Sequence, residues 1–171
     1  MNLQASAKRT LTLIAVALVV VLIAFTTVMV VLIRGSDSEP ARITAYTHGT
    51  TSEVAPYVYC GIYLDECVGD EESTFLDVPP GMPLQLSLPS EISDAPWLLI
   101  AAYMAPDGTG IAAPSSYAAG EAAAVTVPSS EEFPLIGVEI RLPSAVIDEN
   151  ENPQARAVWS VATASDVATD Q

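Results

Sequence analysis

The stretch "LIGVEIRLP", from Leu135 to Pro143, alternates apolar residues with polar or small ones. Every second residue of it is apolar, in the order Ile136, Val138, Ile140 and Leu142. Successive side chains of a β-strand point to opposite faces, so this period of two predicts a strand with one face in a core. The proline at its end is typical of a strand terminus, because proline cannot donate a hydrogen bond to a neighbouring strand.

The same signals recur along the rest of the chain. All 13 prolines follow Glu39, and most of them flank apolar runs, which argues against helices because a proline inside a helix costs about 3 kcal/mol. We expect about seven strands, with "TFLDV" (74–78) as a possible eighth. The others are "RITAYT" (42–47), "YVYCGIYL" (57–64), "PLQLSLP" (83–89), "WLLIAAYM" (97–104), "AAVTV" (123–127), "LIGVEIRLP" (135–143) and "RAVWSVAT" (156–163). The continuously apolar 97–104 run predicts a central strand covered on both faces.

Turn signals such as "PDGTG" (106–110) separate these runs. Short strands with turns between them predict two packed antiparallel sheets. The expected fold class is therefore mainly β: a single N-terminal transmembrane helix followed by an immunoglobulin-like antiparallel β-sandwich.

The first forty residues predict the membrane helix. Residues 11–33 contain no charge, proline or glycine, and a helix of about twenty such residues crosses a bilayer. A cleaved signal peptide has an apolar core of only about 7–15 residues and a small-residue cleavage site, so we expect a retained anchor. The chain then divides into a cytoplasmic tail (1–10), a transmembrane helix (11–33), a spacer (34–40), an extracytoplasmic domain (41–163) and a polar tail (164–171).

The distribution of charge predicts the orientation. Lys8 and Arg9 precede the span, and this basic flank favours a cytoplasmic N-terminus in the cell membrane and an extracytoplasmic C-terminal domain. All 21 acidic residues but only three of the six basic ones lie beyond Arg34, so the exported part has a formal charge of −18. Such a surface repels nucleic acid, which excludes it as a partner.

The only two cysteines, Cys60 and Cys67, lie in "YVYCGIYLDEC" (57–67). Disulfides persist outside the cytoplasm, and an even count favours a Cys60–Cys67 bridge that pins the end of a strand to the acidic loop after it. In the chain-entropy model, closing this loop of about eight residues contributes roughly 2.5 kcal/mol. With one histidine, His48, and no Cys-x-x-Cys spacing, the chain predicts no structural metal site and no cofactor.

The candidate catalytic residues are few. Ser-His-Asp chemistry would have to use His48, on the predicted turn "YTHGTT", and no Gly-x-Ser-x-Gly motif is present. The sequence "DGTG" (107–110) resembles an aspartic-protease motif in the wrong order and predicts a hairpin turn. A carboxylate pair of the glycosidase kind stays open from composition alone. We name no catalytic residue and expect no enzymatic activity.

Two acidic clusters could attract cations. The disulfide loop and the residues after it carry Asp65, Glu66, Asp70, Glu71 and Glu72, which predicts at most weak, millimolar-range cation binding. The second cluster, "DENEN" (148–152), spaces oxygen ligands like half of a calcium loop. Pro153 then stands where that loop needs glycine, so we expect a solvated hairpin loop there.

The tyrosines near the disulfide are the better candidates for binding. In an unbroken strand Val58, Cys60, Ile62 and Leu64 would face the core, leaving Tyr57, Tyr59 and Tyr63 on the opposite face. Tyrosine is enriched in protein interfaces, so these three side chains form a candidate interaction surface. The alternative is that a loop covers them or that both faces are buried.

The order of five segments resembles a family of actinobacterial membrane-anchored or exported proteins of unknown function (DUF2771-like). The segments are "YVYCGIYLDEC", "VPPGMPLQLSLPSEISDAPWLL", "YAAGEAAAVTVP", "LIGVEIRLP" and "ARAVWSVAT". The resemblance covers almost the whole exported domain. It implies a corynebacterial or mycobacterial type of envelope and supplies no activity and no catalytic residue.

Two classes of function remain after these exclusions. The first is a non-catalytic, single-pass envelope protein whose domain docks onto an envelope membrane protein or complex. The second is an extracytoplasmic, carboxylate-dependent hydrolase acting on cell-wall glycan, with a weak cation-binding module between the two. We expect the first, by analogy with the binding roles of β-sandwiches.

Overall fold

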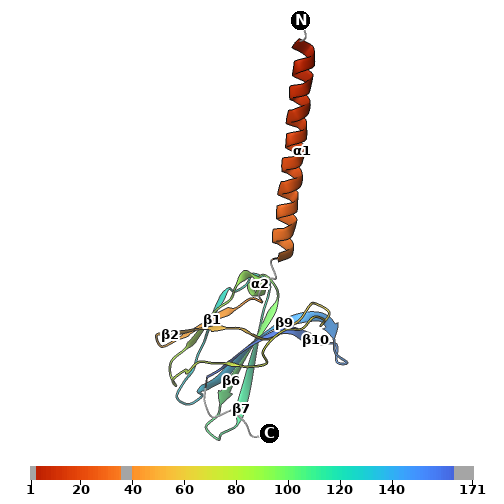
Figure 1. Cartoon of the computed structure of the whole chain (residues 1–171). Coiled ribbons are helices and arrows are strands. Elements are labelled where there is room, and N and C mark those ends of the chain that lie inside the picture. Colours follow the sequence, from red (N-terminus) through yellow and green to blue (C-terminus); the bar gives the residue numbers. More distant parts are fainter. Residues whose placement is uncertain (1–2, 36–39, 164–171) are drawn as a thin grey trace. The chain divides into compact units, whose positions relative to one another are not determined.

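The computed structural model describes residues 3–35 and 40–163 and divides the chain into two compact units (Figure 1). The first unit is a helix, and the second, from Pro40 onwards, is a β-domain. The predicted polar tail (164–171) and residues 36–39 of the predicted spacer lie outside the described residues.

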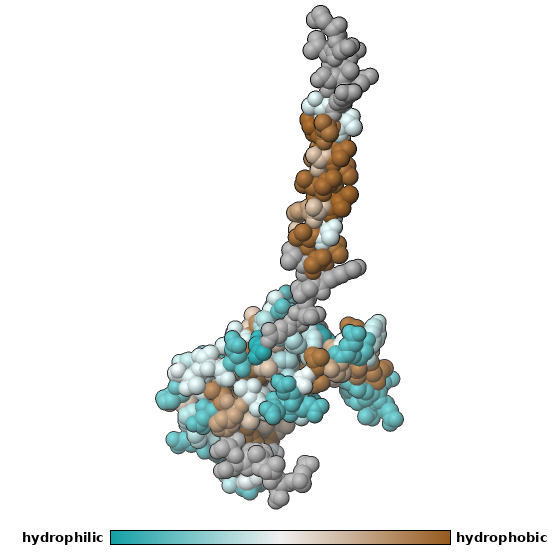
Figure 2. Space-filling view, viewed as in Figure 1, coloured by the Kyte–Doolittle hydropathy of each residue, from teal (hydrophilic) through white to brown (hydrophobic). Residues whose placement is uncertain are grey.

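The helix α1 spans Leu3–Gly35, and its apolar stretch Thr10–Val31 is long and apolar enough to cross a membrane. Figure 2 shows this stretch as a band of apolar side chains. Two threonines within it satisfy their hydroxyls locally: Thr26 Oγ1 donates to Leu22 O at 2.5 Å and Thr27 Oγ1 donates to Ile23 O at 2.7 Å. These bonds keep the polar groups compatible with lipid. The predicted apolar helix is confirmed, whereas its orientation stays a prediction.

The smaller sheet has four antiparallel strands in the order β2-β1-β5-β8. These strands are β2 (Thr50–Val54), β1 (Ile43–Thr47), β5 (Leu84–Ser87) and β8 (Ala124–Val127). A two-residue turn joins β1 to β2, since Thr47 pairs with Thr50. His48 and Gly49 both have positive φ there, at 41° and 80°, as a type I′ hairpin turn requires. His48 therefore lies on the turn that the sequence predicts.

The larger sheet has six strands, in the order β3-β10-β9-β6-β7 with β4 added to β10. These strands are β3 (Pro56–Tyr59), β10 (Pro153–Ala162), β9 (Leu135–Ile147), β6 (Trp97–Met104), β7 (Gly110–Tyr117) and β4 (Thr74–Phe75). β4 pairs with β10 in parallel, whereas the other named pairings are antiparallel. The short helix α2 (Ser90–Ser93) connects β5 to β6.

One hydrophobic core joins the two sheets. Leu84 and Leu86 of the smaller sheet belong to the same buried cluster as Val138, Ile140 and Trp159 of the larger one. Inward positions alternate with outward ones along β5 and the second half of β10, and from Val138 to Leu142 in β9, as the sequence pattern predicts. At the start of β9 a register irregularity buries Leu135 and leaves Ile136, predicted to face the core, half-buried. The mainly-β class and the two antiparallel sheets with a shared core are thereby confirmed.

Four details of the strand prediction were wrong. Residues 3–35 and 40–163 form ten strands, and the prediction missed β2 and β7. Both carry few buried side chains and so lack an apolar alternation. The 57–64 strand ends at Tyr59, where the disulfide loop begins. The 97–104 strand is buried on one face and only half-buried on the other, while β9 continues beyond Pro143 to Ile147.

Candidate interaction surface

A Cys60–Cys67 disulfide closes the loop that follows β3, with 4.0 Å between the two Cα atoms. Two reciprocal backbone bonds support it: Tyr59 N donates to Val68 O at 2.7 Å, and Val68 N donates to Tyr59 O at 2.8 Å. The predicted bridge, and its role of pinning the strand end to the acidic loop, are both confirmed.

The interior of the disulfide loop is a tight backbone turn. Gly61 N donates to Asp65 O at 2.7 Å, and Leu64 N donates to Gly61 O at 3.0 Å. Gly69, just after the loop, has a φ of +147°, and a Cβ on it would lie 2.4 Å from Tyr57 O. Only glycine fits there, because the clash would be with backbone rather than with a movable side chain. The loop therefore has a defined conformation.

Backbone bonds also attach the loop to the long β9–β10 hairpin. Cys60 N donates to Arg156 O on β10 at 2.7 Å, and Ala145 N on β9 donates to Ile62 O at 2.9 Å. Cys60 itself is buried. Backbone hydrogen bonds thus fix the loop at Cys60, Ile62 and Val68. Because its backbone is already ordered, the loop loses little conformational entropy when a partner binds.

The three predicted tyrosines do not form one row. Tyr59 packs against the core, with its ring centroid 6.2 Å from that of Trp159 in an edge-to-face arrangement and with Arg156 over its ring at 5.6 Å. Tyr57 is half-buried, whereas Tyr63 is 72% exposed. They separate because β3 ends at Tyr59 and the chain then turns, so the strand alternation does not reach Tyr63.

The turn instead exposes apolar side chains. Ile62, predicted to face the core, and Val68 are each more than half exposed, as is Tyr63. We call Ile62, Tyr63 and Val68 the loop patch. The signal for it in the sequence is Gly61, which breaks the alternation next to the first cysteine and could have indicated a turn.

The acidic residues around the loop patch are all exposed, namely Asp65, Glu66, Asp70, Glu71 and Glu72. Within residues 3–35 and 40–163, no three His, Cys, Asp or Glu side chains come together in a way that could hold a metal ion. The cation-binding hypothesis therefore has no geometric support there. Exposed apolar side chains and exposed carboxylates thus share this loop and the residues just after it.

The other predicted loops hold their carboxylates in local hydrogen bonds. Asp107 Oδ1 accepts from Thr109 Oγ1 at 2.6 Å and from Thr109 N at 3.0 Å, and these bonds lower the pKa of Asp107 below its ordinary value. Asp148 Oδ1 accepts from the backbone N–H groups of Asn150 and Asn152, each at 2.8 Å. Both segments are hairpin turns, as predicted.

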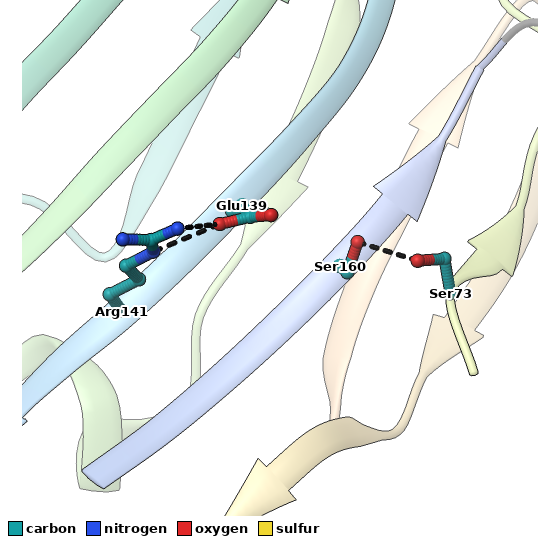
Figure 3. Close-up of polar contacts among 4 residues, drawn as sticks. All are labelled: Ser73, Glu139, Arg141 and Ser160. Carbon is teal, nitrogen blue, oxygen red and sulfur yellow. Dashed lines mark hydrogen bonds and ion pairs between the residues drawn. The ribbon is translucent and has the colours of Figure 1, made fainter. Parts of the chain in front are cut away.

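Outward-facing polar residues of the larger sheet pair with one another. Figure 3 shows Arg141 binding Glu139 Oε2 through Nε at 2.9 Å and Nη2 at 2.5 Å, and Ser73 Oγ lying 2.8 Å from Ser160 Oγ. The ion pair is partly exposed, so it contributes at most about 1 kcal/mol. The guanidinium of Arg141 is therefore paired with a carboxylate of its own strand.

A groove of about 440 Å³ lies where β6 and β7 meet the β9–β10 hairpin. Its lining includes Trp97, Tyr117, Arg141, Pro143 and Asn152 but no Asp or Glu. Trp97 stacks on Tyr117 with ring centroids 4.1 Å apart. This groove does not supply the opposed carboxylates that the glycan-hydrolase hypothesis needs.

The described residues define a protein with one apolar helix, able by length and composition to span a membrane, and a disulfide-bonded β-sandwich. The chain belongs to the family described as "Protein of unknown function (DUF2771)", which matches residues 36–164. It is 33% identical over 135 residues to uncharacterized proteins of Mycobacterium tuberculosis and Mycobacterium bovis, covering 76% of this chain and 82% of each relative. No solved structure matches it. The suspected family is thereby confirmed.

Proposed function

We propose that this chain is a non-catalytic, single-pass membrane protein whose β-sandwich binds an envelope membrane protein or complex. The N-terminus lies in the cytoplasm and the domain lies outside it. Two observations support this placement: the apolar stretch Thr10–Val31, and a disulfide, which persists in oxidising compartments. The basic flank at Lys8 and Arg9 supports the orientation.

The observation that carries the proposal is the loop patch. Its three apolar side chains are exposed on a loop that a disulfide and several backbone hydrogen bonds hold in place. Partner binding would bury these side chains and would cost little ordering entropy, because the loop backbone is already fixed. The exposed carboxylates of the same segment would then favour a partner that also carries basic residues.

The experiment is a mild-detergent purification of tagged full-length protein from its own membranes, with mass spectrometry of the proteins that accompany it. We expect a reproducible, stoichiometric membrane partner for the natural sequence. The variant Tyr63→Ser with Ile62→Ser should lose that partner. Met82→Ser, which alters an exposed apolar residue outside the loop patch, should retain it.

Stability measurements distinguish loss of binding from loss of folding. Changes at Tyr63 should alter the free energy of unfolding by less than about 0.5 kcal/mol, because this side chain contacts mainly solvent. Tyr59→Ala should be clearly destabilising, since Tyr59 packs on Trp159. Purification of the protein alone, even after cross-linking in intact cells, would refute the proposal.

A further inference from the structure

The strand β7 forms one border of the larger sheet (Figure 1). In the described part of the chain only β6 pairs with it. Its residues from Gly110 to Ser116 are all exposed, and none of the eight in "GIAAPSSY" is charged, although the chain carries a net charge of −15. Natural edge strands usually carry charges that prevent further pairing. Apart from Pro114, β7 carries no such protecting residue.

The register shows which backbone groups face outward. Ala105 N donates to Thr109 O, so the next pair, Met104 with Gly110, is of the type that does not exchange hydrogen bonds. The two pair types alternate along an antiparallel ladder. The backbone N–H and C=O groups of Gly110 and Ala112 therefore point away from β6 and are available to an added strand.

Pro114 interrupts this open edge. It pairs with Ile100 at another outward position, where a proline removes no bond to β6 but leaves the edge without one donor. An incoming strand can therefore pair continuously only with residues 110–113. This limits the docking segment to the half of β7 that contains Ile111.

A hollow of about 400 Å³ adjoins that half of the strand. Its lining is almost entirely apolar and comprises Tyr103, Ile111, Pro128, Ser130 and Phe133. Ile111 is 44% exposed and Phe133 is 38% exposed. Residues directly opposite each other on paired strands point to the same face, so the residue opposite Ile111 would place its side chain towards the hollow.

Carboxylates lie near the start of the docking segment, because Met104, the partner of Gly110, donates its N–H to Pro134 O. Asp107 lies in the turn before β7, and the exposed Glu131 and Glu132 precede Phe133. A partner segment with Lys or Arg at the end next to Gly110 would meet these charges, while its uncharged centre would pair with the uncharged strand.

We propose that residues 110–113 of β7 accept an extended segment of a partner protein as an added β-strand. The segment has a large apolar side chain that enters the hollow at Ile111 and Phe133, and it has a basic residue at the end that lies next to Gly110. Main-chain hydrogen bonds provide affinity, and the hollow provides specificity. This surface is separate from the loop patch, so it does not depend on the function proposed above.

The test measures binding of dye-labelled heptapeptides to the full-length protein in neutral detergent micelles by fluorescence anisotropy. The peptides are Lys-Thr-Val-X-Val-Thr-Lys, with X as Phe, Leu or Ala, together with their Glu-ended counterparts. We expect the Lys-ended Phe or Leu peptide to bind at least about tenfold more tightly than the Ala and Glu-ended ones, because only it both fills the hollow and meets the carboxylates. A tenfold difference in affinity corresponds to about 1.4 kcal/mol.

Two variants at one position test the edge itself. Ala112→Pro removes the outward N–H without removing a bond to β6, and it should weaken peptide binding about tenfold or more, whereas Ala112→Ser keeps the N–H and should stay within about twofold. Circular dichroism verifies that both variants fold. Ile111→Ser provides an independent variant of the hollow and should also weaken binding.

Three results would overturn the proposal. They are failure of every Lys-ended peptide to bind folded protein, equal binding by Ala112→Pro and Ala112→Ser, and a dimer of this chain that Ala112→Pro abolishes, which would assign the edge to a second copy. The double variant Tyr63→Ser with Ile62→Ser should leave peptide binding unchanged. The hypothesis that the loop patch binds a membrane partner and the hypothesis that β7 binds a peptide can therefore be refuted separately.

Discussion

Replacing each of the two tryptophans by phenylalanine would isolate the contribution of one buried hydrogen bond. Trp159 and Trp97 are almost equally buried, at 1% and 2% exposure, and both belong to the core. Trp159 Nε1 donates to Ala41 O at 2.7 Å, which ties the start of the domain to β10. Trp97 Nε1 is buried and has no hydrogen-bond partner among the described residues.

The magnitudes follow from this difference. Both substitutions remove similar ring volume, so the cavity cost is common to them and largely cancels in the comparison. Trp159→Phe additionally leaves Ala41 O without its donor, which costs about 1–3 kcal/mol. Trp97→Phe removes an unpaired donor whose burial already costs roughly 1–3 kcal/mol in the natural protein, so part of that cost is recovered. We expect Trp159→Phe to be the more destabilising by about 2–4 kcal/mol.

The assay is urea unfolding of the two variants and the natural protein, followed by far-UV circular dichroism because both variants change the fluorescence. The free energies of unfolding are compared at equal m-values, so that the difference reports stability and not a change in the unfolded state. Equal destabilisation by the two variants would refute the reasoning, as would a larger effect at Trp97.

Three further outcomes follow from the loops. Replacing Cys60 and Cys67 together by alanine should lower the free energy of unfolding by roughly 2.5 kcal/mol in the chain-entropy model, because the bridge closes a loop of about eight residues; an unchanged urea midpoint would contradict this. Gly49→Ala should cost about 1–2 kcal/mol by thermal unfolding, because Gly49 has a φ of +80° while open space surrounds its Cα; a neutral effect would exclude strain at this turn. Thr109→Ala should raise the pKa of Asp107 part of the way to its ordinary value in a carboxyl NMR titration, since it removes the Oγ1 bond, the largest cause of the lowering, and keeps the backbone N–H bond. In the natural protein the lowered pKa means that this carboxylate stabilises the fold above its unfolded-state pKa, and that the contribution disappears as the pH falls through the folded-state pKa.

The fold class was predictable because most core strands have one buried face. Leu84 and Leu86 on β5, or Val138 and Ile140 on β9, must alternate with polar residues to meet the core, and this alternation is visible in one dimension. The edge strand β7 was not predictable in this way. Its side chains are exposed on both faces, so its pairing with β6 imposes no apolar period.

The candidate site was predictable only in part, for a similar reason. The disulfide follows from compartment and cysteine number, which are properties of the chain as a whole. The exposure of Ile62 and Tyr63 depends on where β3 stops, and it stops at Tyr59 because the bonds from Tyr59 to Val68 and from Gly61 to Asp65 favour a turn over a longer strand.

The sequence by itself determined the apolar helix, the disulfide, the mainly-β class and the family, since each depends on composition, spacing or a local period. The tertiary structure alone decided which side chains near Cys60 face solvent and which strands form the sheet edges. The first depends on backbone bonds within and next to the disulfide loop, such as Gly61 N to Asp65 O, and the second on pairing between strands far apart in sequence. Neither kind of bond leaves a periodic trace in the chain.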